Sequence, residues 1–443
     1  MKNQNKQIQF RIPKFVYELM QEDLRKPHPF AYERVGFLFT KTILLFDTSY
    51  LIVATDYLPI ADEDYIEDMN VGAKINSNSI RTAMQGIVDR NGGCFHVHLH
   101  NHSGKPYPSF TDQESLPGIV NSFSNIASKQ ANGILILSRD GFYTDIKYGK
   151  EAQTYKANTI SVVGYPFLFQ YSGIKINKNT IYDRQSFLGT TSQFLFENIR
   201  VGIIGYGGGG SHIGQQLAHI GVKNIIVFDD DKVEATNLNR LIGSVFLDIK
   251  NAVLKTTIAS RIIKKILPSA KVITVNKKWQ QAPSLLQSCD VVFGCVDSYT
   301  ERQQLEAECR RFLIPLIDIG MDVHQFEVGY SMSGQILLSM PGSACQSCYG
   351  YLTEKKLAKE AEKYGKVGGR PQVVWPNGVL ASTAVGIFVD LITGWTKETN
   401  KEVYLSYDGN SGKIEEHVRL RFSPKCCEHY PLNEVGPIKY RRI

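Results

Sequence analysis

The sequence predicts an α/β protein with two domains, a mixed α/β domain over residues 1–150 and a doubly wound α/β domain over residues 181–443, joined by a connecting segment at 151–180. Two observations support this division. In the first domain, short runs of apolar and β-branched residues are mixed with helical spacing. From Ile199 onward the order becomes strand, glycine-rich turn, helix and strand, which is the βαβ opening of a doubly wound sheet.

The composition is that of an ordinary globular protein, with a net charge of +7, 43% hydrophobic residues and eight cysteines in 443 residues. These values exclude collagen-like, wholly disordered and small disulfide-bonded proteins. Met1 to Phe15 lack the apolar core of a secretion signal, so we expect a cytoplasmic protein with reduced cysteines. Gly378 to Trp395 is long and apolar but contains Asp390, and we expect a buried helix there rather than a membrane span. The positive charge is spread along the chain, so we expect neither a membrane nor a nucleic acid as partner.

In the first domain we expect several strands and one helix. The strands cover residues 33–39, 44–54, 93–100, 134–138 and 141–147, and the helix covers residues 78–89.

Histidines cluster at the end of the strand expected at 93–100. The four in this cluster are His96, His98, His100 and His102. Alternate residues of a strand share a face, so these side chains start out pointing the same way. Ser109 and Asp112 follow across a loop. Two histidines spaced by two residues, with a carboxylate about a dozen residues later, can supply three zinc ligands and leave a fourth place for water.

Zinc lowers the pKa of a bound water to about 7, and a nearby carboxylate must then shuttle the proton. Glu33 is the candidate carboxylate. The set resembles the JAMM (MPN-type) metalloprotease family, whose members carry a Glu near a Gly, then His-x-His, a loop and Ser-x-x-Asp. The resemblance implies that His98, His100 and Asp112 hold a catalytic zinc, that Glu33 is the general base and that Ser109 stabilises the oxyanion.

This chain departs from the family pattern in its loop. Asn101 stands where the family usually has proline, and Ser109 lies one residue too far from His100. Pairing His100 with His102 instead leaves the loop one residue too short, so His102 remains the alternative ligand. A solvated, non-catalytic histidine-rich loop, or adventitious metal binding, is the other interpretation.

The second domain opens with a strand at 201–204, a glycine-rich turn at 205–211, a helix at 213–220 and a strand at 224–228. Such a turn lets backbone N–H groups approach a phosphate, but it would also suit a dinucleotide. The acidic run Asp229-Asp230-Asp231 then stands at a strand end, where it can hold ribose hydroxyls. Arg240 and Lys255 suit a triphosphate. Asp297 ends a buried strand and is well placed to bind Mg²⁺.

Together these motifs resemble the ubiquitin-activating superfamily, specifically the ThiF/MoeB/HesA adenylyltransferases, over residues 181–443. The resemblance implies a Rossmann-like adenylation domain in which the C-terminal carboxylate of a ubiquitin-like protein attacks the α-phosphate of ATP. The residues implied to bind ATP are Gly205, Gly207, Gly208, Gly210, Asp229, Asp231, Asn237, Arg240, Lys255 and Asp297.

Within this set the resemblance implies that Asp229 binds the ribose, that Arg240 and Lys255 bind the phosphates, and that Asp297 binds magnesium. Two residues more than usual separate Arg240 from Lys255. Arg184 matches an arginine of the family that reaches into the nucleotide site of a partner subunit, which implies a homodimer. Unrelated nucleotide or dinucleotide binding is the alternative.

A Cys-x-x-Cys pair and a later cluster of two ligands suit a tetrahedral structural zinc. The family has two Cys-x-x-Cys pairs. Here the ligands at that spacing are Cys345, Cys348, Cys426 and His429, with Cys427 as the competing donor. A redox pair, or no metal at all, is the alternative. The other four cysteines are expected to be buried and inert.

Many members of the family also carry a cysteine just before a Gly-Val-Leu element, where it forms a thioester. Here the element is Gly378-Val379-Leu380, and residues 365–377 contain no cysteine. The activated carboxylate would then pass directly to a partner's thiol or to a sulfur donor. The run at 354–370 is either a mobile loop over this site or a solvated helix and turn.

The sequence therefore favours a bifunctional enzyme of a bacterial-type ubiquitin-like modification system, which uses ATP, Mg²⁺, a catalytic zinc and a structural zinc. Its expected partners are a ubiquitin-like or sulfur-carrier-like protein ending in glycine and a conjugating-enzyme-like protein. The alternatives are a sulfur-carrier adenylyltransferase of cofactor biosynthesis and a non-catalytic scaffold that binds a ubiquitin-like protein.

Overall fold

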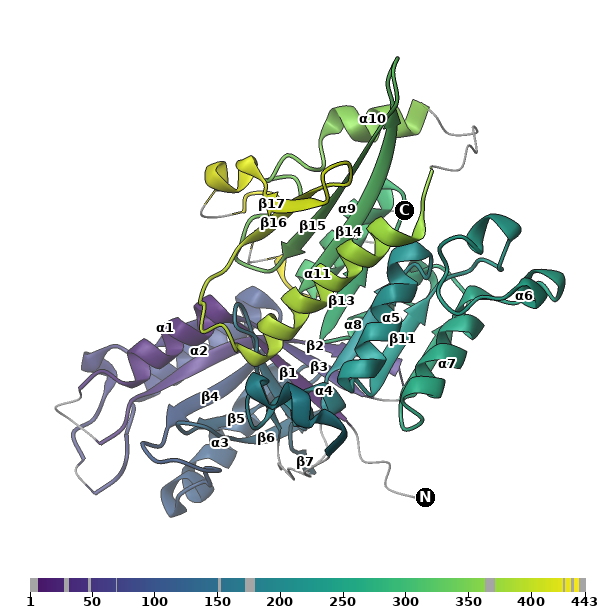
Figure 1. Cartoon of the computed structure of the whole chain (residues 1–443). Coiled ribbons are helices and arrows are strands. Elements are labelled where there is room, and N and C mark those ends of the chain that lie inside the picture. Colours follow the sequence, from purple (N-terminus) through teal and green to yellow (C-terminus); the bar gives the residue numbers. More distant parts are fainter. Residues whose placement is uncertain are drawn as a thin grey trace. The chain divides into compact units, whose positions relative to one another are not determined.

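The computed structural model describes residues 7–27, 32–46, 49–68, 70–149, 153–171, 180–362, 371–424, 427–431 and 434–437. The chain divides into two compact units (Figure 1). The first comprises Met1–Val163, Leu168–Ile174 and Leu432–Ile443, and the second comprises Gly164–Phe167 and Lys175–Pro431.

The described residues of the first unit form a nine-stranded mixed sheet in the order β7-β6-β5-β4-β2-β3-β1-β8-β9. The strands are β1 (Ile8–Pro13), β2 (Val35–Leu44), β3 (Tyr50–Pro59), β4 (Gly93–Leu99), β5 (Ala131–Leu137), β6 (Phe142–Tyr148), β7 (Thr154–Tyr155), β8 (Thr159–Val163) and β9 (Leu168–Tyr171). The helices are α1 (Lys14–Leu24), α2 (Ser77–Arg90) and α3 (Phe110–Ile126).

Apolar side chains cover both faces of this sheet. One cluster packs α1 against β1 and the central strands and contains Phe10, whose ring meets that of Phe95 edge-on at 5.0 Å. The other packs α2 and α3 against β2 and β4 around Phe37 and Phe123. Helix α2 begins where the Asn76 side chain accepts hydrogen bonds from two backbone N–H groups, as expected of an N-cap residue.

Two boundaries differ from the sequence predictions. The segment 44–54, predicted as one strand, is divided between two strands, since β2 ends at Leu44 and β3 begins at Tyr50, and Leu45 N–H donates to the Ser49 carbonyl at 2.8 Å. The sheet also continues past residue 150, since β8 pairs in parallel with β1 and β9 pairs with β8. These two strands extend the first unit into the segment predicted as a connection.

The described residues of the second unit form an eight-stranded sheet in the order β12-β11-β10-β13-β14-β15-β16-β17. Its strands are β10 (Arg200–Ile204), β11 (Asn224–Phe228), β12 (Lys271–Val275), β13 (Val291–Gly294), β14 (Leu316–Gln325), β15 (Tyr330–Ser339), β16 (Val403–Asp408) and β17 (Lys413–Glu416). Its helices are α4 (Ser192–Asn198), α5 (Gly208–Ile220), α6 (Phe246–Lys250), α7 (Lys255–Ile266), α8 (Pro283–Gln287), α9 (Tyr299–Arg311), α10 (Glu354–Glu362) and α11 (Val374–Thr393).

The first five strands in this order, β12 to β14, are parallel, and the rest are antiparallel. The chain leaves β10 toward β11 on one side and later returns to β13 on the other side. Where the strand order reverses in this way, a crevice opens beyond the carboxyl ends of the strands, and ligands of doubly wound sheets bind there.

Helix α11 contains most of the apolar segment at 378–395. It is long and apolar enough to cross a membrane by length and composition alone. In the structure it packs against α5 and against β14 and β15, and Figure 1 shows α11 and α5 side by side. Its one acidic residue, Asp390, accepts hydrogen bonds from the Tyr165 hydroxyl and from Thr396 Oγ1, the latter at 2.7 Å. The segment therefore forms the buried helix that was predicted.

Candidate functional site

A cavity of about 480 Å³ lies at the switch point of the second unit. Most of the residues predicted to bind nucleotide line it: Gly205, Gly207, Gly208, Asp229, Asp231, Asn237, Arg240, Lys255 and Asp297. Two predicted residues do not line it. Gly210 lies beneath the loop, and Arg184 is exposed in a 3₁₀ helix, Thr180–Leu188.

The glycine-rich loop after β10 needs its glycines for different physical reasons. Gly205 has a φ of +85°, and a Cβ there would lie 2.7 Å from the Cys295 carbonyl oxygen. A Cβ on Gly210 would lie only 2.1 Å from the Gly205 carbonyl oxygen. By contrast, a Cβ on Gly207 would meet no atom of the described residues within 4 Å. Two glycines therefore permit close packing, and Gly207 leaves open space in front of the start of α5, where a phosphate can approach.

Asp229, at the end of β11, connects the glycine-rich loop to the next part of the site. Its Oδ2 accepts from Tyr206 N–H at 2.7 Å, and its Oδ1 accepts from Asp231 N–H at 2.9 Å. Burial raises the pKa of Asp229, against the lowering effect of Lys255, whose Nζ lies 3.7 Å away. Lys255 Nζ also contacts Asp231 Oδ2 at 2.6 Å. One ammonium group thus pairs with two carboxylates, and all three side chains line the cavity.

Arg240 and Asn237 belong to a tight turn after this acidic run. The Asn237 side chain accepts from Glu234 N–H at 3.0 Å, so it fixes the turn and is buried. The Arg240 guanidinium donates to Asn239 Oδ1 at 3.1 Å and lines the cavity. The Arg240 guanidinium can therefore contact a ligand, whereas the Asn237 side chain stabilises the turn by its hydrogen bond to the Glu234 N–H.

Asp297 follows β13, is exposed and lines the cavity. Its Oδ1 accepts from Gln372 Nε2 at 3.3 Å. Arg302, in the first turns of α9, is buried and also lines the cavity. It pairs with Asp318, donates to the Ile319 carbonyl at 3.0 Å and donates to the carbonyl of Val296, just after β13, so it ties the ends of β13 and β14 together at the site.

Sequence reasoning missed Glu360 of α10. This carboxylate accepts from the N–H groups of Tyr299 and Thr300, each at 2.9 Å, and so caps the first turn of α9. Gln372 was missed in the same way. Both come from segments distant in sequence, and only the tertiary structure brings Glu360 to the start of α9 and Gln372 to the cavity. Of the run at 354–370, interpreted as either a mobile loop or a solvated helix and turn, residues 354–362 form the helix α10 and residues 363–370 lie outside the described part of the chain.

In the first unit, Glu33, His98 and His100 come together, with one ligand atom of each within 4.8 Å of the others. The strand register causes this. Val35 of β2 pairs with His98 of β4, so Glu33, just before β2, meets the end of β4. The two Nε2 atoms lie 3.2 Å apart, and Glu33 Oε1 lies 3.9 Å from His100 Nε2.

Asp112 completes the group, with Oδ2 lying 3.5 Å from His98 Nε2 and 4.0 Å from His100 Nε2. Its Oδ2 also accepts from Ser109 Oγ at 2.8 Å, at the start of α3. Burial opposes the charge of Asp112, but His98 and Ser109 together lower its pKa. His102, the alternative ligand, is exposed and its Nδ1 contacts the Ser103 carbonyl at 2.9 Å. The structure thus groups His98, not His102, with His100.

Glu33 differs from Asp112 in its electrostatics. Burial raises the pKa of the Glu33 carboxyl, with His98 opposing and Asp112 adding to the rise. Burial also lowers the pKa of His100, so its imidazole is held neutral, as a metal ligand requires. Two histidines and a carboxylate with a second carboxylate nearby form a donor set that fits zinc with an open position.

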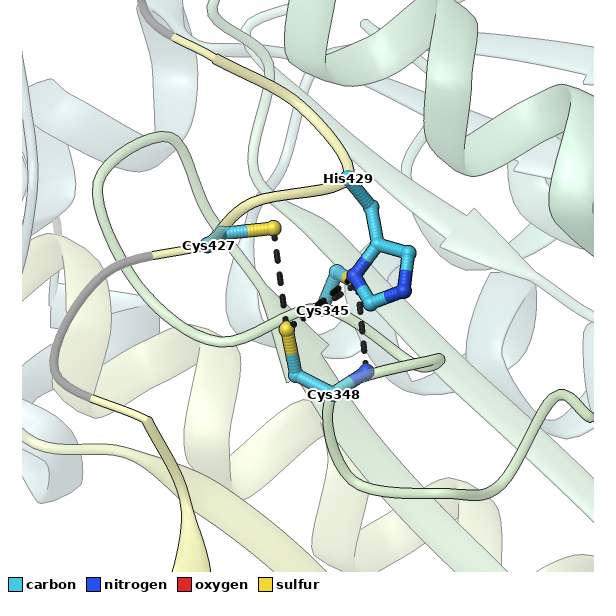
Figure 2. Close-up of side chains that lie close together, drawn as sticks. All are labelled: Cys345, Cys348, Cys427 and His429. Carbon is cyan, nitrogen blue, oxygen red and sulfur yellow. Dashed lines mark hydrogen bonds between the residues drawn. The ribbon is translucent and has the colours of Figure 1, made fainter.

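A second donor cluster lies in the second unit and consists of Cys345, Cys348, Cys427 and His429 (Figure 2). The Cys345 and Cys348 sulfurs lie 3.5 Å apart, and those of Cys348 and Cys427 lie 3.7 Å apart. His429 Nδ1 is 3.4 Å from the Cys348 sulfur. Tetrahedral zinc with Zn–S bonds of about 2.3 Å sets sulfur–sulfur distances of about 3.8 Å, so this donor set fits zinc. Cys427, the competing donor, stands in this cluster, and Cys426 lies outside the described residues.

The predicted burial of the remaining cysteines holds for Cys94, Cys289 and Cys309, which are buried. Cys295 is different, because it follows β13 and is one of the residues that line the cavity.

The model of the ThiF family matches residues 182–428, which lie within the second unit. Ubiquitin-like modifier-activating enzyme 5 of Culex quinquefasciatus is 30% identical over 174 residues, or 34% of this chain and 41% of that protein. The enzyme of the same name from Bombyx mori is 29% identical over 173 residues, with the same shares. The chain thus spans 41% of the length of these curated relatives.

Solved structures are similar over a larger share of the chain. Escherichia coli MccB, in a structure with AMPCPP and MccA, has a TM-score of 0.45 and 20% identity and covers 55% of this chain and 73% of its own. PaaA has a TM-score of 0.44 and 18% identity and covers 56% of this chain and 87% of its own.

Proposed function

Because the chain belongs to the ThiF family, we propose that its second unit binds ATP with Mg²⁺ and adenylates the C-terminal glycine carboxylate of a ubiquitin-like protein. The single observation that supports this best is the cavity at the switch point of the sheet. It gathers the glycine-rich loop, Asp229, Arg240, Lys255 and Asp297 around one space large enough for a nucleotide.

In the proposed reaction, a carboxylate oxygen of the glycine attacks the α-phosphorus of ATP. A bond forms between that oxygen and phosphorus, the bond from the α-phosphorus to the α,β-bridging oxygen breaks, and pyrophosphate leaves with the electron pair. Arg240 and Lys255 offset the charge that develops on the leaving pyrophosphate. Asp297 would hold Mg²⁺, which when bound neutralises phosphate charge. Asp229 orients the ribose.

The fate of the adenylate follows from the absence of cysteine between residues 365 and 377. We propose that the acyl group passes directly to the thiol of a conjugating-enzyme-like partner. A homodimer, with Arg184 reaching the neighbouring subunit's nucleotide, and a cytoplasmic location are parts of the same proposal. The exposure of Arg184 supports the first of these. Cys345, Cys348, Cys427 and His429 would hold a structural zinc.

For the first unit we propose a zinc-dependent peptidase or isopeptidase that acts on the same C-terminal tail. The grouping of Glu33, His98 and His100 beside Asp112 favours this second function. His98, His100 and Asp112 would hold zinc, which when bound supplies a water of lowered pKa. Glu33 would take up and deliver the proton, and its raised pKa suits this role. Ser109 would donate to the oxyanion.

Variants that disable one unit at a time test both functions. The assays are ATP–pyrophosphate exchange with a small ubiquitin-like protein ending in Gly-Gly, and cleavage of a C-terminal fusion of that protein. Asp297→Ala should abolish exchange and leave cleavage intact, and Glu33→Ala should do the reverse, so each variant is the other's control. Exchange that survives in Asp297→Ala would refute the adenylation site. Cleavage that survives both Glu33→Ala and chelation would refute the peptidase.

A further inference from the structure

The cavity is also lined by three side chains that the proposed adenylation chemistry does not use: Lys278, Trp279 and Glu301. Lys278 and Trp279 follow β12. The sheet order is β12-β11-β10, and neighbouring strands lie about 4.8 Å apart. The end of β12 is therefore about 10 Å from the end of β10, where the glycine-rich loop begins.

This spacing indicates which strand end each part of a bound nucleotide would occupy. Phosphates at the loop after β10 and a ribose at Asp229 after β11 leave the base at the end of β12. Trp279 is buried there and offers an apolar surface to the base. Glu301 of α9 lines the same cavity, and α9 is joined to the segment after β12 by the hydrogen bond of Gln280 to Gln304.

The position of Glu301 is fixed from both sides. It lies in the first turn of α9, where its N–H donates to Ser298 Oγ at 3.2 Å and where the Glu360 carboxylate caps the two preceding N–H groups. Gln280 Nε2 donates to Gln304 Oε1 at 3.1 Å, which ties α9 to the segment after β12. Because this turn is already held in place, the Glu301 side chain would lose little conformational entropy when it binds a ligand.

The surroundings of Glu301 leave its carboxylate in need of a donor. Burial raises the pKa of Glu301, Lys278 opposes the rise, and Asp230 and Asp297 add to it. Lys278 is exposed and shares its charge with solvent. A hydrogen-bond donor on the ligand would therefore stabilise this carboxylate.

We propose that Glu301 is the specificity-determining residue for the base, and that its carboxylate accepts a hydrogen bond from the 6-amino group of a purine. A 6-oxopurine places a carbonyl oxygen at the same position, where two acceptors would face each other. This inference rests on the proposed binding of a nucleotide in this cavity. It extends that proposal by assigning the choice between amino- and oxopurines to one side chain.

The test compares ATP with ITP, which differ in the purine ring at position 6, by titration calorimetry of the full chain with Mg²⁺. The unmodified chain should bind ATP more tightly, by about tenfold to a hundredfold, the size of a hydrogen bond to a charged group. Glu301→Gln should reduce the preference to within about threefold, because an amide both donates and accepts. Glu308→Gln is the matched control on the same helix. The Glu308 carboxylate binds Gln287 at 2.8 Å, and the variant should keep the preference.

The outcomes separate the two proposals. Equal affinity for ATP and ITP in the unmodified chain, or an undiminished preference in Glu301→Gln, would overturn the role of Glu301 while leaving ATP binding in place. Failure of the unmodified chain to bind either nucleotide would overturn both. If Glu301→Gln unfolds in a thermal melt, Glu301→Ala serves instead. In that variant the affinity for ATP should fall and that for ITP should not, and a parallel fall in both would contradict the inference.

Discussion

Replacing Lys255 by methionine should separate the stability of the second unit from its binding of ATP. The ion pair of Lys255 with Asp231 contributes little to folding, because the Asp231 side chain is 66% exposed. Pairs of this kind contribute about 0–1 kcal/mol. The backbone bond from Lys255 N–H to the Asp231 carbonyl, 3.0 Å long, does not depend on the side chain. The buried Asp229 carboxylate, 3.7 Å from Lys255, keeps its two hydrogen bonds from backbone N–H groups in the variant, so we expect a small change in the unfolding temperature.

Binding of ATP should respond far more strongly. A hydrogen bond between an ammonium group and a phosphate contributes about 1.5–3 kcal/mol, which corresponds to about 10- to 150-fold in affinity. Loss of the ammonium also leaves the carboxylates of Asp229 and Asp231 facing the triphosphate. Restoring neutrality with Asp231→Asn in the Lys255→Met background should recover part of the lost affinity.

The assay is titration calorimetry with ATP and Mg²⁺, with a thermal melt of each variant. Lys265→Met, on the exposed last turn of the same helix α7, is the control and should bind ATP as the unmodified chain does. An unchanged affinity in Lys255→Met would refute the assignment of this lysine to the phosphates. A large loss of stability in that variant would refute the structural reasoning.

Three further predictions concern packing, metal and pH. Gly210→Ala should lower the free energy of unfolding in urea by about 1–3 kcal/mol, because the added Cβ would lie 2.1 Å from a carbonyl oxygen. Gly386→Ala in α11 is the control, since its Cβ would meet no atom of the described residues within 4 Å, and it should not lower the free energy of unfolding. Equal losses in the two variants would contradict this. Cys348→Ser should lose one equivalent of zinc in metal analysis, whereas Cys94→Ala should lose none; equal zinc in both would contradict the cluster. Although burial opposes it, hydrogen bonds from the first turn of α9 lower the pKa of Glu360 below its ordinary 4.5. The Glu360 carboxylate therefore stabilises the fold above pH 4.5, and this stabilisation is lost as the pH falls through the lowered pKa. The difference in free energy of unfolding between the unmodified chain and Glu360→Gln should shrink in acid. A difference that stays constant with pH would refute this.

The parts of the site found from sequence are those that local spacing determines. The glycine-rich loop, Asp229 and Lys255 lie near the ends of neighbouring parallel strands, so a strand–turn–helix pattern already places them together. Local spacing could not assign different tasks to the glycines. Gly210 packs against the loop's own carbonyl, whereas Gly207 faces open space, and this difference depends on atoms brought in by the fold.

The parts that sequence reasoning missed depend on pairing between distant segments. Strand β1 was not predicted, although it lies between β3 and β8 in the first sheet, since a short strand takes its place only through its neighbours. Glu360 caps α9 across about sixty residues of chain, and no local pattern marks such a contact. Sequence spacing also left open whether Cys426 or Cys427 joins the cluster, because it cannot distinguish between two adjacent cysteines.

A crystal structure of the full chain with ATP and Mg²⁺ tests the central claim most directly. We predict density for the triphosphate beside Gly205–Gly210, the ribose at Asp229 and a metal ion bound by Asp297. Density for the nucleotide elsewhere, or a binding mode in which Asp297 and Lys255 contact neither phosphate nor metal, would contradict the account.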